Sequence, residues 1–227
     1  MSIRAAWERH ADEWITWARA PDHDGFWNET WPNLRAVLPR PGEGVVVELG
    51  CGEGRVARKL LDLGYAVVGI ERSPKLGSAA AAASQNTAVV LADAVALPFT
   101  TASTELAIAC MSLQDLDDLE TSMTEVGRVV RPGGYFCVAL VHPFASAAAP
   151  TAMRGSEFRV KGPYLDERRY TERVERDGLQ MTFESVHRPL SAYVAAWSRA
   201  GFVITDLSES GDGNVPWLLV VQARRVQ

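Results

Sequence analysis

Acidic residues and glycines alternate in one short stretch of this chain, and their spacing favours a bound small ligand. The pattern Glu-x-Gly-x-Gly-x-Gly runs from Glu48 to Gly54, after the apolar run 45–47 and before the helix-forming run 56–61. Since glycine has no Cβ, the backbone can turn tightly there and a ligand can come close. The first N–H groups of the next helix are free to bind an anionic group. A tight strand-to-helix turn without a ligand is the alternative interpretation.

A second carboxylate, Glu71, lies about twenty residues after the glycines, at the end of the apolar run 65–70. A carboxylate at such a strand end accepts hydrogen bonds from the ribose hydroxyls of a nucleotide cofactor. A solvated strand-end carboxylate is the alternative. The dinucleotide pattern G-x-G-x-x-G is absent because Arg55 stands where its third glycine would be. The glycine turn is therefore not of the dinucleotide-binding type.

Composition narrows the function classes. The 227 residues carry a net charge of −5, which argues against an extended nucleic-acid surface. Cys51, Cys110 and Cys137 are far apart and form no C-x-x-C pair, so neither a disulfide framework nor a zinc site is predicted. No signal-peptide pattern and no apolar run of membrane-spanning length is present, so we expect no membrane association. Reduced thiols and a cytoplasmic location are expected.

Strand-like and helix-forming runs alternate along the chain, which predicts one α/β domain over residues 1–227. In a doubly wound sheet of this kind, ligands bind at the carboxyl ends of the strands, where Glu48 and Glu71 would lie. The predicted strands are 45–47, 65–70, 88–91, 106–110, 135–141, 202–204 and 217–221.

Two further segments are expected to enclose the ligand. Residues 1–40 should form helices over about 3–20 and 26–38, and Trp7, Trp14 and Trp17 recur at helical spacing. These helices would either pack on the domain as an amphipathic layer or form a lid, and the two interpretations are compatible. Residues 144–188 interrupt the alternation with scattered aromatic and charged residues. Such long insertions are commonly functional, and we expect a substrate cover.

From about 45 to 141 and 187 to 222, the chain resembles the class I S-adenosylmethionine (SAM)-dependent methyltransferases, and among them small-molecule enzymes of the actinobacterial natural-product type. The resemblance implies a Rossmann-like α/β fold with a seven-stranded sheet of order 3-2-1-4-5-7-6, strand seven antiparallel, and helices on both faces. It also implies SAM as cofactor and S-adenosylhomocysteine (SAH) as its product. The segments that carry it are 48–55, Glu71, 92–94, 111–115, 128–134 and 187–190.

The resemblance also assigns cofactor contacts. Glu48 and Gly50 would lie at the methionyl end, and Gly52 and Gly54 would allow close approach. Glu71 would bind the ribose. Asp93 would accept from the adenine amino group, which suits an ionised, acceptor-only carboxylate. Further expected contacts are Trp14, Cys51, Arg55, Arg72, Ser73, Ala94, Met111 and Ser112. Glu48 departs from the commoner aspartate and reaches one methylene further.

The implied reaction is methyl transfer to a nitrogen, oxygen or carbon of a small molecule with an aromatic or indole-like part. His142, at a strand end, is the first candidate for a general base and His187 the second. The alternatives are a structural histidine before a proline turn and a helix-start histidine that binds backbone. Gln114, Asp115, Tyr164 and Tyr170 are expected to orient the acceptor. No metal is expected, since the acids at 115–118 suit the opening of a helix.

Other function classes stay open from the sequence. A nicotinamide-dependent oxidoreductase would share the fold and Glu71 but leaves Asp93 without a role. A protein or RNA methyltransferase would share the cofactor, but the net charge is acidic and no Asn/Asp-Pro-Pro-aromatic motif follows the fourth strand. A non-catalytic SAM-binding module would not need the 144–188 segment. Homo-oligomer formation through that segment or through the N-terminal helices is also left open.

Overall fold

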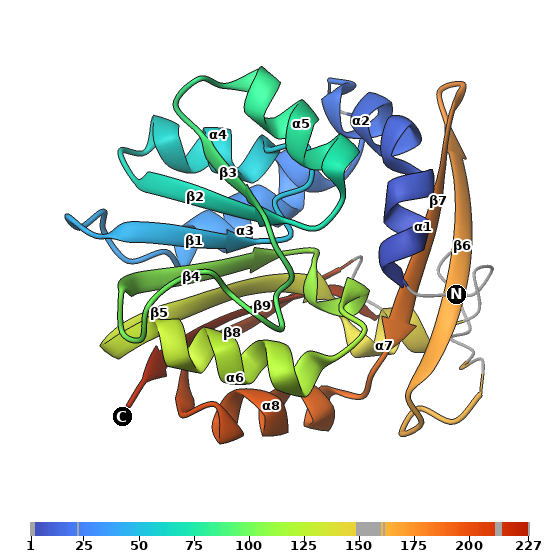
Figure 1. Cartoon of the computed structure of the whole chain (residues 1–227). Helices are drawn as coiled ribbons and strands as arrows, with labels where there is room; N and C mark the ends of the chain where they lie inside the picture. Colours follow the sequence, from blue (N-terminus) through green and yellow to red (C-terminus); the bar gives the residue numbers. More distant parts are fainter. Residues whose placement is uncertain (1–2, 22, 149–159, 161, 212–214, 227) are drawn as a thin grey trace.

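The architecture is an α/β sandwich around one central sheet, seen in a computed structural model (Figure 1). The structure describes residues 3–21, 23–148, 160, 162–211 and 215–226. The seven-stranded sheet has the order β3-β2-β1-β4-β5-β9-β8. Its strands are β1 (Val45–Leu49), β2 (Ala66–Glu71), β3 (Ala88–Leu91), β4 (Thr104–Cys110), β5 (Val130–Val141), β8 (Phe202–Gly211) and β9 (Pro216–Arg225).

The pairing confirms the predicted topology. Strands β1 to β5 pair in parallel, whereas β9 runs antiparallel to both β5 and β8. Counted within the sheet, this is the order 3-2-1-4-5-7-6 with an antiparallel seventh strand. The carboxyl ends of β1, β2 and β4 point to one edge, toward the N-terminal helices (Figure 1). The strand β5 begins at Val130 rather than at the predicted Tyr135.

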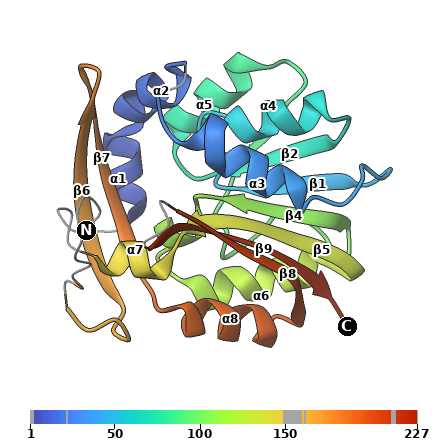
Figure 2. The ribbon, with the colours of Figure 1, turned by 180° about the vertical axis from the view of Figure 1, so that it is seen from behind.

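Helices cover both faces of the sheet (Figures 1 and 2). Because successive strand residues point to opposite faces, Val46 packs in one core with Leu60, while Val47 packs in the other with Met123 and Trp197. These residues are all 1% exposed or less, so each face is a dry, close-packed layer that holds the strand ends in place. The helices are α3 (Trp31–Ala36), α4 (Arg55–Asp62), α5 (Pro74–Ala83), α6 (Leu119–Val129) and α8 (Leu190–Arg199).

The N-terminal helices are shorter than predicted. The expected helix over 3–20 is broken at His10 into α1 (Ile3–Arg9) and α2 (Ala11–Arg19). The expected helix over 26–38 begins as a wide π-type turn, η1 (Phe26–Thr30), before α3. Pro32 lies in the first turn of α3, directly after the change from π-type to α-helical backbone.

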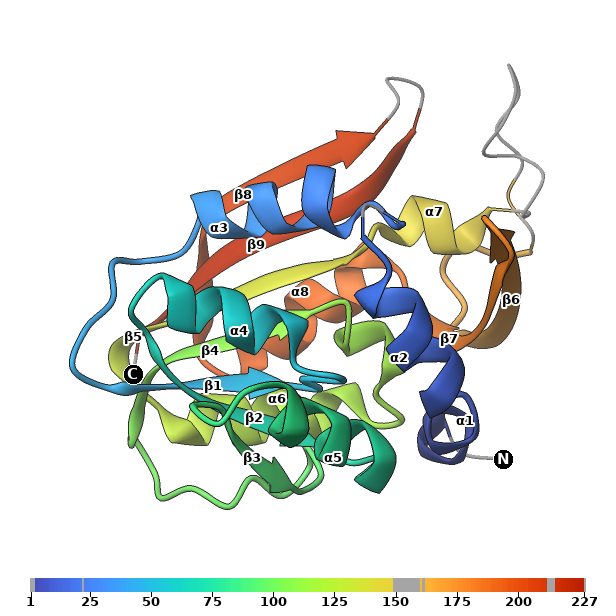
Figure 3. The same cartoon turned by 90° about the horizontal axis from the view of Figure 1, so that it is seen from above.

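The segment predicted as a cover forms the short helix α7 (Pro143–Ala147) and a two-stranded antiparallel ribbon of β6 (Arg168–Arg176) and β7 (Leu179–His187). Asp177 and Gly178 join the strands, both with positive φ, as in a type I′ hairpin turn. The ribbon stands beside α1 and α2 at the carboxyl edge of the sheet (Figure 3). Residues 149–159 and 161, part of the predicted cover, lie outside the described residues. In the described ranges, no helix combines the length and apolar character that crossing a membrane requires.

Candidate active site

A cavity of about 1060 Å³ opens at the carboxyl edge of the sheet. Its walls come from the ends of β1, β2 and β4, the helices before β1, and the inner face of the β6–β7 ribbon. Almost all of the predicted cofactor residues line this cavity, namely Trp14, Glu48, Gly50, Cys51, Gly52, Arg55, Glu71, Arg72, Ser73, Asp93, Ala94, Met111 and Ser112.

The glycine turn needs glycine for steric reasons. Gly50 and Gly52 have φ values of 64° and 57°, a region that residues with a Cβ rarely adopt. A Cβ on Gly50 would lie 2.7 Å from the Ser112 Cβ, and one on Gly52 would lie 3.1 Å from the Trp14 indole nitrogen. Gly54 differs from the expectation. It does not line the cavity, and its missing Cβ instead lets α4 approach Ala80 of α5, 3.1 Å away.

Glu71 is tied to the glycine turn. The Gly52 amide donates to Oε2 at 2.8 Å, and the amides of Arg72 and Ser73 donate to Oε1 at 2.7 and 2.8 Å. Burial raises the pKa of this carboxyl, and the backbone donors oppose that rise. A carboxylate can accept about four hydrogen bonds. Glu71 accepts three here, so it can accept one more from a ligand in the cavity. Backbone donors thus orient Glu71 before any ligand arrives.

Asp93 is also held in place before binding. Its Oδ2 lies 3.0 Å from the Arg72 guanidinium, and its Oδ1 accepts from the Val95 amide at 3.3 Å. The pair spans the ends of β2 and β3, with Glu71 beside it. A nucleoside lying along this edge would meet two fixed carboxylates in sequence, which is the arrangement expected from the resemblance.

Glu48 carries an unsatisfied oxygen. The side chain is 2% exposed, and Oε2 has no hydrogen-bond partner within the described part of the chain. Burial, reinforced by the charges of Glu71 and Glu53, raises its pKa to about 8. A buried acceptor without a donor is costly unless a ligand supplies one. The ammonium group of SAM is such a donor, so this end of the cavity fits the methionyl end of the cofactor.

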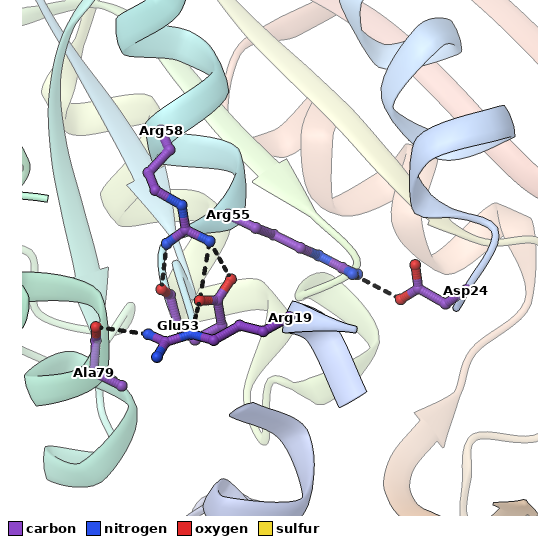
Figure 4. A network of polar contacts seen from close by, with 6 residues as sticks. All are labelled: Arg19, Asp24, Glu53, Arg55, Arg58 and Ala79. Carbon is purple, nitrogen blue, oxygen red and sulfur yellow. Dashed lines mark hydrogen bonds and ion pairs between the residues drawn. The ribbon is translucent and has the colours of Figure 1, made fainter. Parts of the chain in front are cut away.

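Arg55 joins the glycine turn to the N-terminal segment. Its guanidinium donates to Asp24 Oδ2 at 2.7 Å (Figure 4) and lies 4.1 Å from the Phe26 ring centroid and 4.8 Å from that of Trp14. Asp24 and Phe26 could not be predicted as partners of Arg55, because their approach depends on how the N-terminal helices dock. The side chain is 9% exposed, so it is a structural cation of the cavity wall.

A second polar network anchors α2 to the same turn (Figure 4). Glu53 is 1% exposed and accepts from Arg19 at 2.8 Å and from Arg58 at 2.8 and 3.0 Å. Arg19 also donates to the Ala79 carbonyl of α5 at 3.0 Å. One buried carboxylate thus connects α2, α4 and α5, and fixes the position of Trp14 over Gly52.

The end of β4 passes along the cavity in a strained conformation. Met111 has φ 54°, uncommon for a residue with a side chain, and its amide donates to the Ala139 carbonyl at 2.7 Å. Ser112 donates to the Leu49 carbonyl at 2.7 Å, which ties β4 to β1. Gln114 donates to the Met111 carbonyl at 2.7 Å, and its own Oε1 is buried without a partner among the described residues. Gln114 therefore offers an acceptor at the cavity wall.

Asp115 and Tyr170, both predicted to contact the acceptor, meet through the ribbon. Ser185 donates to Asp115 Oδ1 at 2.6 Å and lies directly opposite Tyr170 in the β6–β7 register. Burial raises the pKa of Asp115 to about 8, opposed by the Ser185 hydrogen bond and the Arg188 charge. Burial and the charge of Asp115 raise the pKa of Tyr170. All three residues line the cavity, and Ser185 was not anticipated from the sequence.

The two predicted histidine bases are placed differently. Phe144 donates its amide to His142 Nδ1 at 3.1 Å, and Nε2 binds Glu209 at 2.7 Å, so His142 caps α7. The Tyr164 carbonyl lies 2.9 Å from His187 Nε2, and Ser146 lies 2.7 Å from Nδ1. Burial lowers the pKa of both rings. As far as the described residues form the cavity wall, it includes neither imidazole. The geometry therefore favours the structural alternative for both.

Tyr164, which was expected to orient the acceptor, also lies away from the cavity. Its hydroxyl accepts from the Leu190 amide at 3.1 Å, and its ring packs against Phe144 and His187 outside the cavity wall. By contrast, the sequence interpretation did not find several lining residues. These are Trp17, Asp24, Phe26, Thr30, Glu172, Phe183 and Trp217, all brought in by tertiary contacts. Among the described residues, no group of three or more metal-ligating side chains occurs.

Several known proteins are similar to this chain in sequence or in fold. Residues 47–138 match the family described as "Methyltransferase domain". Demethylmenaquinone methyltransferase from Corynebacterium kroppenstedtii is 35% identical over 115 residues, 51% of this chain and 48% of that protein. Malonyl-[acyl-carrier protein] O-methyltransferase from Enterobacter lignolyticus is 29% identical over 147 residues, 64% of this chain and 55% of that protein. The chain thus spans about half the length of these curated relatives.

The structural likeness is more extensive. A SAM-dependent methyltransferase from Mesorhizobium loti superimposes with a TM-score of 0.70 at 27% identity, over 86% of this chain and 97% of that one. Its fold agrees with the sheet order found here, and the glycine turn, Glu48, Glu71 and Asp93 form a cavity edge that fits SAM. Residues 47–138 therefore carry a methyltransferase domain, in a chain with the fold of the class I SAM-dependent methyltransferases and a cavity that fits SAM as its cofactor.

Proposed function

We propose that the protein transfers a methyl group from SAM to a nitrogen, oxygen or carbon atom of a small molecule with an aromatic or indole-like part. One observation supports this most. A single cavity runs from the glycine turn and Glu71 to an aromatic wall that includes Trp7 and Phe183. Flat apolar rings are the usual partners of such a wall. We further propose a cytoplasmic enzyme of natural product biosynthesis.

The residues divide the cavity into two parts. Glu71 and Asp93, each fixed by backbone or arginine donors, would hold the nucleoside, and Glu48 would receive the ammonium group. SAM supplies a methyl group already activated on a positively charged sulfur. The chain's own task is to orient the acceptor and exclude water, and orientation contributes up to about 7–11 kcal/mol in favourable cases.

The acceptor end has its own polar groups. Gln114 Oε1 has no partner among the residues that the structure describes, and Asp115 and Tyr170 lie on one wall and are joined through Ser185. These side chains would orient a polar acceptor atom beside the end of β4. Asp115 is also the ionisable group placed to receive a proton there, a role that the two buried histidines do not fit in this arrangement. Proton transfer of this kind contributes about 10²–10⁴-fold.

Calorimetric titration with SAM, SAH and NADH tests the cofactor part of the proposal. The protein should bind SAM and SAH but not NADH, and Asp93→Ala should weaken both about tenfold, the equivalent of one lost hydrogen bond. Transfer of label from methyl-tritiated SAM to a panel of small aromatic acceptors tests the reaction. NADH binding, or label found only in added protein or RNA, would overturn the proposal. Gel filtration of the same sample would show whether a homo-oligomer forms.

A further inference from the structure

The inner face of the β6–β7 ribbon presents an ordered set of side chains to the cavity. Arg168, Tyr170 and Glu172 of β6 line it and are the half-buried residues of this part of the strand, because successive strand residues point to opposite sides. The more exposed Arg169, Thr171 and Arg176 also border the cavity. Ser185 and Phe183 of β7 lie directly opposite Tyr170 and Glu172. Glu172 and Phe183 are therefore neighbours on one wall. They lie two residues along the ribbon from Tyr170 and from Ser185, which contacts Asp115.

Glu172 is a carboxylate without a cation. It is half-buried, and in the described part of the chain it makes no ion pair and no hydrogen bond. Two other acids of the cavity have an arginine partner, Asp93 with Arg72 and Asp117 with Arg169. Burial raises the pKa of Glu172. A carboxylate removed from water in this way gains most from a ligand that brings a positive charge.

An aromatic cluster surrounds the residue opposite Glu172. The Phe183 ring lies 6.5, 6.2 and 6.3 Å from the rings of Trp7, Trp14 and Trp17, each edge to face. Ring faces attract cations. The cluster already stabilises one, since the Arg55 guanidinium lies over Trp14. The walls of this end of the cavity are therefore suited to positive charge on a flat or apolar ligand.

The charged side chains of the whole cavity also favour a cationic ligand. Its described lining contains nine carboxyl groups and five guanidinium groups, with no lysine or histidine. Burial raises the pKa of Glu48 and Asp115 to about 8, and even with these two protonated the acids outnumber the guanidinium groups. Two of the arginines, Arg168 and Arg176, donate to backbone carbonyls rather than to acids. An excess of acids in a cavity raises the local concentration of cationic ligands and disfavours anionic ones.

We propose that the acceptor is a cationic amine, held with its nitrogen between Glu172 and the aromatic cluster of Trp7, Trp14, Trp17 and Phe183. This inference rests on the proposed methyl transfer and narrows its acceptor to one chemical class. The ammonium group first gives a proton to the Asp115 carboxylate. The nitrogen lone pair then forms the N–C bond while the C–S bond breaks and its electron pair stays on sulfur. The positive charge thus passes to a nitrogen beside Glu172, where a carboxylate stabilises it.

Binding to the SAH-saturated protein tests this without any turnover. Tryptamine, tryptophol and indole-3-propionate share a ring and differ in an amine, a hydroxyl or a carboxylate. Tryptamine should bind at least about tenfold more tightly than tryptophol, and indole-3-propionate more weakly than either. Benzylamine and benzyl alcohol repeat the comparison on a smaller ring. Glu172→Gln should abolish the preference for the amine. Glu175→Gln, an exposed carboxylate on the same strand, should keep it.

The outcomes separate the two proposals. Equal binding of amine and alcohol, no binding of any probe, or an amine preference that persists in Glu172→Gln would overturn the amine site. So would a loss of SAH affinity in Glu172→Gln, because Glu172 would then serve the cofactor. An amine preference with no label transferred from SAM would overturn the methyl transfer. Methylation of tryptophol without any amine preference would overturn the amine site alone.

Discussion

The Glu71 carboxylate and the Gly52 amide, 2.8 Å apart, join the end of β2 to the turn after β1. The contact links the residue predicted to bind the ribose to the turn predicted to admit the cofactor. Because Gly52 also lies under the Trp14 indole, the conformation of the glycine turn is constrained by Glu71 on one side and by Trp14 on the other. The cofactor edge is therefore preorganised by contacts that exist without the ligand.

Gly52→Ala should weaken SAM binding as well as the fold. The φ of 57° would cost about 1–2 kcal/mol for alanine, and the new Cβ would displace Trp14. Gly64→Ala is the matched control, since Gly64 has φ 90° and open space around its Cβ position. Both variants should lose stability in urea unfolding, Gly52→Ala by more because of the Trp14 contact, and only Gly52→Ala should lose SAM affinity. Equal SAM affinity in the two would show that the turn does not contact the cofactor.

Glu48 should make stability fall as pH rises. Its pKa is raised from 4.5 to about 8 in the folded state, so the unfolded chain ionises first. The penalty is absent below about pH 4.5 and complete above about pH 8. Glu48→Gln removes it and should raise the free energy of unfolding above pH 8 by about 2–5 kcal/mol. Unfolding curves between pH 4 and 9 measure this, and a constant difference between variant and parent would contradict it.

Asp115 should govern the pH dependence of turnover. With a pKa of about 8, its basic form accumulates as pH rises, so kcat should climb to a plateau above that value. Asp115→Asn should lower kcat about 10²–10⁴-fold with little change in SAM affinity. Ser185→Ala removes a hydrogen bond that stabilises the ionised form, so the profile should move to higher pH. An unchanged pH profile of kcat in Ser185→Ala would show that Asp115 does not accept the proton.

His142→Asn and His187→Asn should affect stability more than catalysis. Both rings use both nitrogens in hydrogen bonds, and a lost buried partner costs about 1–3 kcal/mol. Since burial lowers both pKa values from 6.5, the unfolded chain binds protons first and stability falls as pH drops through that value. Thermal unfolding and turnover should be measured together. A large loss of kcat at unchanged stability would restore the catalytic role.

Glu53→Gln should loosen α2 from the sheet. It would leave two arginines without their charge partner at a side chain that is 1% exposed, a loss of about 3 kcal/mol. Hydrogen exchange should then speed up in α2 and SAM should bind more weakly. The exposed pair of Arg199 and Glu120 provides the control, and Arg199→Gln should change stability by less than about 1 kcal/mol. Unchanged exchange in α2 would assign its docking to other contacts.

The centre of the sheet could be predicted because β1, β2 and β4 contain apolar runs that are buried on both faces. Glu71 and Asp93 reach the cavity since parallel strands place their ends at one edge. For the histidines the sequence left both roles open, because it does not show whether a strand-end ring points inward or caps the next helix, as His142 does. The partners of Arg55 depend on helix docking, which no local pattern encodes. The Asp177–Gly178 hairpin signal, however, was present in the sequence and would have located the ribbon.

The contacts between the N-terminal helices and the ribbon join segments far apart in the chain. Glu13 accepts from the Thr182 amide across 169 residues, and Arg9 binds Glu184 across 175. Contacts of such sequence separation form late, after the local elements. During synthesis the tryptophans of α1 and α2 are therefore not covered by β7 until most of the chain has been made. Until β7 has emerged, the growing chain exposes this aromatic surface, and that interval is when it is most open to aggregation or to a chaperone.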